Sequence, residues 1–134
     1  MADSAFDWIE YLRLAKELAN RGEESCLRTS LSRAYYYVFH IAMARAERNG
    51  FELRPGESTH NQLWRLYITN PEPQCVKLAQ IAQRLKEKRE RADYRQLYPR
   101  ISEEVPTVLA DAQDFANRLN NLDARHPDPA SMRK

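Results

Sequence analysis

Two residues have the types and spacing that phosphodiester chemistry requires. Arg33 and His40 are seven positions apart, so a helix would place them two turns apart and within about 20° of the same face. A histidine can transfer a proton near neutral pH, and an arginine can stabilise the charge that develops on a phosphorane. The nearby arginine would also lower the histidine pKa and favour the neutral base. The pair predicts a metal-independent catalytic centre.

The residues around this pair are almost all apolar. Residues 34–44 read AYYYVFHIAMA, and only His40 interrupts the apolar and aromatic run. A helix that is apolar on every side must be covered on every side. We expect one face to fill the protein core and the face of Arg33, Tyr37 and His40 to be covered by a second copy of the chain, which predicts a homodimer. We also expect Tyr37 to contact a bound RNA or nucleotide. The alternative is that His40 and the tyrosines are only packing residues.

A basic stretch between residues 84 and 100 is the second candidate region. It holds seven basic and three acidic residues, a local charge of +4, whereas the rest of the chain sums to −2. Such a patch suits phosphate contacts, and an interleaved tyrosine can stack on a base. We therefore expect RNA or nucleotide binding by Arg89, Arg91, Asp93 and Tyr94. The alternative is a solvated helix face with charges paired four residues apart.

Two polar residues connect these regions. Asp93 is predicted to anchor an arginine in an ion pair, and Arg33 is the suggested partner, which would bring both regions into one cleft. His60 lies in the first turn of a short predicted helix, where it either helps to cap the helix or belongs to the binding site. Cys26 and Cys75 lack zinc-ligand spacing, and the carboxylates form no metal motif, so no metal or other cofactor is expected.

The elements that must position these residues are all predicted to be helical. Apolar residues recur at helical spacing in segments at about 5–20, 24–48, 74–94 and 102–122, and in a short helix that ends at Ile68. The predicted N-caps are Ser4 for the first helix and Ser58 or Thr59 for the short one. No strand-like period competes, so we expect an all-α antiparallel bundle of four or five helices.

Chain length and composition indicate a single domain and limit the classes of function that we expect. The chain has 134 residues, one domain's length, with a formal net charge of +2 and an arginine to lysine ratio of 16 to 5 that suits phosphate contacts. Residues 1–122 are expected to form the domain, and the proline-containing residues 123–134 a disordered tail. No apolar run is long enough for a membrane span, and the acidic N-terminus is unlike a secretory signal. We expect a cytoplasmic protein with no membrane partner.

The stretch SRAYYYVFHIAMA resembles the Ser-Arg-Ala-Tyr-Tyr-Ala-x-Phe-His signature of the HEPN superfamily, in its branch of small stand-alone bacterial and archaeal proteins. Tyr37 replaces the usual alanine. The motifs STH at 58–60 and RADY at 91–94 follow in the expected order, and the resemblance covers about residues 5–122. It implies an antiparallel helical bundle, usually a homodimer, that binds nucleotides or RNA.

The resemblance leaves two functions open. Many members are metal-independent ribonucleases of toxin–antitoxin or defence systems, often paired with a minimal nucleotidyltransferase antitoxin. Their signature has Arg and then His after four to six positions, a spacing that Arg33 and His40 meet, although Ala34 replaces the usual polar residue. In the toxin branch the motif lies on a later helix, where this chain has RERADY without a following histidine. The alternative is a non-catalytic nucleotide-binding or regulatory module that docks on a nucleotidyltransferase-type partner.

Overall fold

All the regular secondary structure that the structure, a computed structural model, describes is helical. It describes residues 5–130, which contain five α-helices and no strand. The helices are α1 (Ile9–Arg21), α2 (Glu24–Arg48), α3 (Thr59–Ile68), α4 (Pro73–Tyr94) and α5 (Ile101–Asn121). The predicted all-α class is confirmed. None of the helices in the described range has the length and apolar character needed to cross a membrane.

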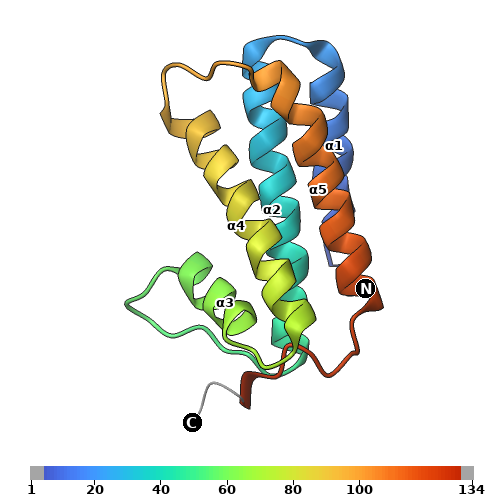
Figure 1. The fold of residues 1–134 in the computed structure, drawn as a ribbon, viewed down its shortest axis with the longest axis vertical. Helices are drawn as coiled ribbons and strands as arrows, with labels where there is room; N and C mark the ends of the chain where they lie inside the picture. The colour runs from blue at the N-terminus through green and yellow to red at the C-terminus, as the bar shows by residue number, and fades with distance from the viewer. Residues whose placement is uncertain (1–4, 131–134) are drawn as a thin grey trace.

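The long helix α2 is the centre of the bundle (Figure 1). It packs against α1, α4 and α5, while the short helix α3 packs mainly on α4. Because neighbours cover α2 on several sides, its apolar residues are buried around most of its circumference, as the run of apolar residues predicts. Tyr35, Val38 and Ala42 have no exposed surface. The candidate site lies on the remaining part of the α2 surface, which faces α1 and the C-terminal half of α4.

The start of α1 differs from the prediction. The helix begins at Ile9 and not near residue 5, and the predicted cap, Ser4, lies outside the described residues. The carboxylate of Asp7 accepts a hydrogen bond from the backbone N–H of Ile9 at 3.1 Å and so performs the capping role. Residues 5–8 therefore precede the helix, and the rings of Phe6 and Trp8 pack with the ring of Tyr11, with ring centres 4.9–5.7 Å apart.

The segment that follows α5, in the range predicted to be a disordered tail, lies against the end of α2. Arg45 of α2 is only 8% exposed. Its guanidinium donates to four backbone carbonyls, those of Leu119, Leu122, Asp123 and His126, at 2.7–3.1 Å. The amino-acid composition of this segment could not reveal its contacts with Arg45, because they are made by backbone carbonyls, which every residue carries. Residues 131–134 lie outside the described range.

Candidate functional site

The ring of Tyr36 lies at the centre of the candidate site. The guanidinium carbons of Arg33, on α2, and Arg89, on α4, each lie 5.3 Å from its ring centre. The ring centres of His40 and His60 lie 6.3 Å and 5.9 Å from it. We call these five residues the Tyr36 cluster. The structure thus brings together four residues that the sequence predicted for the site, and it does so from three helices.

Arg33 has no acidic partner among residues 5–130. Its guanidinium carbon lies 4.7 Å from the ring centre of Tyr11, and within residues 5–130 the side chain makes no hydrogen bond or ion pair. Asp93 is paired with an arginine as predicted, but Arg33 is the wrong partner, because Asp93 lies one turn after Arg89 on α4 and pairs with it at 3.4 Å. A half-buried guanidinium held only by aromatic rings keeps its charge and its donors available for an anion.

His40 is held flat against an aromatic ring. The ring centres of Trp8 and His40 are 3.5 Å apart and the rings are inclined by only 4°. No described residue forms a hydrogen bond with the imidazole nitrogens. Burial is the main cause that lowers the pKa of His40 below 6.5, and the charge of Arg33 adds to it. The imidazole is therefore neutral near pH 7, the protonation state that a general base requires.

A hydrogen-bond chain fixes the tautomer of His60. The indole N–H of Trp64 donates to the hydroxyl of Tyr35 at 3.0 Å, and this hydroxyl lies 2.5 Å from Nδ1 of His60. Burial raises the pKa of Tyr35 to about 12, so the hydroxyl keeps its proton. Because the indole can only donate, the hydroxyl accepts from Trp64 and donates to Nδ1. Neutral His60 then carries its own proton on Nε2 and offers an N–H donor.

The lowered pKa values predict a loss of stability in acid. Burial is also the main cause that lowers the pKa of His60, followed by Arg89. Below pH 6.5 the unfolded chain takes up protons on His40 and His60 that the folded protein binds less readily. The free energy of unfolding should fall as the pH drops, by at most about 1.4 kcal/mol per pH unit for each histidine, until the folded-state pKa values are reached.

Urea unfolding of the wild type and of the double variant His40→Gln/His60→Gln, at several pH values from about 7.5 to about 5, measures this dependence. The double variant should lose less stability than the wild type over the same range. Equal losses in both proteins would mean that other groups control the acid sensitivity. The third histidine, His126, is present in both proteins and cancels in the comparison.

The structure separates three of the predicted binding residues from the cluster centre. Tyr37 is buried, with 5% of its surface exposed, which corrects its place in the predicted site; the neighbouring Tyr36 takes that place because successive side chains of a helix point about 100° apart. Arg91 is exposed and lines a shallow hollow on α4 with Tyr94. Tyr94 is 76% exposed and lies at the edge of the cluster, its ring centre 6.0 Å from the guanidinium carbon of Arg89.

The chain itself covers part of the face that was expected to need a second copy. Trp8 stacks on His40, and Tyr11 lies against Arg33. Sequence reasoning missed both rings as site residues, although FDWIEY, at residues 6–11, is the most aromatic part of the first predicted helix. Burial of this face therefore no longer requires a homodimer, which stays a proposal.

Comparison with known proteins gives no family for this chain: no family model, no curated protein and no solved structure matches it.

Proposed function

We propose that this protein binds a phosphate of RNA or of a nucleotide at the Tyr36 cluster. The observation that carries the proposal is that two arginines lie against the same ring, each with its guanidinium carbon 5.3 Å from the ring centre of Tyr36. Arg33 has five N–H donors and uses none of them on residues 5–130, whereas Arg89 donates to Asp93 at 3.4 Å and also interacts with the hydroxyl of Tyr94. Asp93 is the single acidic group bonded to this pair within that range. Two guanidinium groups that contact the same ring and have unused donors suit phosphate oxygens better than any neutral ligand.

The sequence supports the same proposal. The motif around Arg33 and His40, the STH motif that contains His60 and the RADY motif that follows Arg89 are the residues that resemble the HEPN superfamily. The cluster consists of side chains from these same three regions. Membership in that superfamily would make the protein a nucleotide-binding or RNA-binding homodimer, with a nucleotidyltransferase-type antitoxin or a defence protein as a further partner.

We propose RNA cleavage without a metal as the activity of the cluster. His40 removes the proton of a ribose 2′-hydroxyl, the 2′ oxygen attacks phosphorus, and the bond from phosphorus to the 5′ oxygen breaks. The 5′ oxygen leaves with the proton that His40 has taken. Arg33 and the Nε2–H of His60 stabilise the charge on the non-bridging oxygens. The products are a 2′,3′-cyclic phosphate and a free 5′-hydroxyl.

A second function is favoured by the stack of Trp8 on His40. This stack covers one face of the imidazole and fixes the ring, as in a packing residue. In that case the cluster binds a nucleotide without cleaving it, and the protein is a regulatory or accessory module. Binding and cleavage must therefore be measured separately.

Binding is tested with a 2′-O-methyl oligoribonucleotide, which lacks the attacking hydroxyl and cannot be cleaved by this route. Arg33→Gln and Arg89→Gln should each weaken binding by about tenfold or more, because each removes a charge-assisted hydrogen bond of about 1.5–3 kcal/mol. Arg13→Gln is the matched control. Arg13 is exposed and lies about 200° around α1 from Tyr11.

Fluorescence anisotropy gives the three dissociation constants, and circular dichroism verifies that each variant is folded. Folded Arg33→Gln and Arg89→Gln proteins that bind as tightly as the Arg13→Gln protein would contradict the proposal. A uniform loss in all three variants would indicate a general charge effect and not a site.

A further inference from the structure

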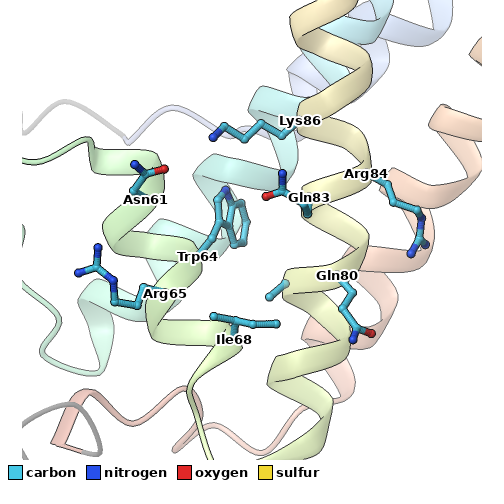
Figure 2. A pocket seen from close by; sticks show the side chains of 9 residues that line it. Asn61, Trp64, Arg65, Ile68, Gln80, Gln83, Arg84 and Lys86 are labelled. Carbon is cyan, nitrogen blue, oxygen red and sulfur yellow. The ribbon is translucent and has the colours of Figure 1, made fainter.

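A groove lies between α3 and α4 (Figure 2). It encloses a volume of about 670 Å³. Its apolar residues are Trp64, Ile68 and Ala79, and its polar residues are Asn61, Arg65, Gln80, Gln83, Arg84 and Lys86. Figure 2 shows Trp64 and Ile68 directed from α3 toward α4, with Gln83 and Lys86 on the opposite side of the groove. The groove thus combines an apolar floor with a polar rim.

The floor is short and presents only carbon atoms. Trp64 is mostly buried and its N–H is already bonded to Tyr35, so the indole offers the groove a part of its carbon edge. Ile68 is 44% exposed and extends the apolar strip. The helix α3 has ten residues and is therefore about 15 Å long. A partner helix needs apolar anchors over two or more turns, so this floor better fits a small planar group.

The rim is basic. Three of the lining residues are cations and none is acidic. Arg65 is paired with Glu57, and the ammonium of Lys86 lies 3.8 Å from a carboxylate oxygen of Glu90. Arg84 forms no ion pair with any residue of the described range. The groove therefore favours a ligand that carries negative charge beside its planar group.

Three amide side chains complete the rim. The side-chain amides of Asn61, Gln80 and Gln83 make no hydrogen bond within residues 5–130. An amide offers a donor and an acceptor together, which matches the edges of nucleobases. Unpaired bases present these edges to proteins, whereas bases in a duplex do not.

Three residues that line the groove are neighbours of His60 in the Tyr36 cluster. Lys86 lines the groove, and its charge also contributes to the lowered pKa of His60. Asn61 follows His60 in the chain, and Trp64 is joined to His60 through Tyr35. A ligand with a phosphate at the cluster can therefore extend into the groove without leaving the protein surface.

We propose that the groove between α3 and α4 holds the nucleoside next to the phosphate bound at the Tyr36 cluster. Its base lies against Trp64 and Ile68, and its edge contacts the amides of the rim. The protein then selects single-stranded RNA over mononucleotides and over duplex RNA. This inference rests on the function proposed above.

The experiment compares a 2′-O-methyl hexanucleotide with a nucleoside monophosphate as ligands. Ile68→Glu and Arg84→Glu add negative charge to the groove at exposed positions, where the fold tolerates polar residues. Each should weaken hexanucleotide binding by about tenfold or more and change monophosphate binding by less than about twofold. The matched controls are Leu14→Glu and Arg13→Glu, which make the same two changes at exposed positions of α1.

Each other outcome overturns one specific statement. Unchanged hexanucleotide affinity in both groove variants, with a loss in Arg33→Gln, contradicts the groove assignment and leaves the proposed function standing. No loss in Arg33→Gln contradicts the proposed function itself. A synthetic acidic amphipathic peptide that binds the wild type but not Ile68→Glu, with hexanucleotide binding intact in that variant, would make the groove a protein-docking surface and also overturn the assignment.

Discussion

Replacing His40 with asparagine should slow RNA cleavage by at least about a hundredfold, because proton transfer by a positioned side chain contributes about 10²–10⁴ to a rate. Asparagine keeps a polar side chain on the same face of α2 but cannot take up a proton. Binding of the uncleavable 2′-O-methyl oligonucleotide should change little, since the arginines remain. Because the pKa of His40 lies below 6.5, the wild-type rate should rise with pH in mild acid and level off near neutrality. Cleavage assays in EDTA, with product ends identified by mass spectrometry, measure both effects.

The control for this experiment is His126→Asn. His126 lies after α5 and its imidazole is 4.0 Å from a carboxylate oxygen of Glu72, away from the Tyr36 cluster. Its replacement should leave the cleavage rate unchanged. A His40→Asn protein that cleaves as fast as the wild type would contradict the assigned base. Wild-type protein that binds the oligonucleotide at the cluster but cleaves no RNA would establish the non-catalytic function.

Replacing Arg45 with methionine should lower the free energy of unfolding by about 3 kcal/mol or more. Methionine keeps a long aliphatic side chain, but four carbonyl oxygens lose their hydrogen-bond donor. Unsatisfied buried acceptors cost about 1–3 kcal/mol each, and water can reach only some of these. Urea unfolding measures the change.

Arg48→Met is the matched control, since Arg48 lies one turn later on α2, is exposed and forms no ion pair within the described residues. Surface changes of this kind usually alter stability by less than about 0.5 kcal/mol. Equal losses in the two variants would mean that Arg45 does not hold residues 119–126 against α2.

The helices were predictable because each one has local signals. Helix α2 begins and ends at the predicted residues, where apolar periodicity starts and where Asn49 and Gly50 end it. Ser58 caps α3 as predicted by accepting a hydrogen bond from the backbone N–H of Asn61. The predicted start of α1 was wrong because two hydrogen-bond acceptors, Ser4 and Asp7, both fit the sequence pattern of a helix N-cap.

The site was predictable where its residues share one helix. The seven-residue spacing of Arg33 and His40 places them on one face regardless of the tertiary structure. Three consecutive tyrosines point in three directions, however, and only the packing of α1 and α4 shows that Tyr36 faces the cluster and that Tyr37 is buried. The partner of Asp93 was predictable from local spacing, because Arg89 lies four residues before it on the same helix. The expected pair with Arg33 was wrong because an ion pair between helices depends on how they cross.

The most direct measurement of phosphate binding at the Tyr36 cluster is the pKa of His40 and His60 by NMR, with and without a saturating 2′-O-methyl dinucleotide. A phosphate bound by the arginines of the Tyr36 cluster would stabilise both imidazolium forms, so both pKa values should rise on binding. The rise should be absent in Arg33→Gln. Unchanged pKa values at both histidines in the ligand-saturated wild type would show that the phosphate binds elsewhere and would contradict the account.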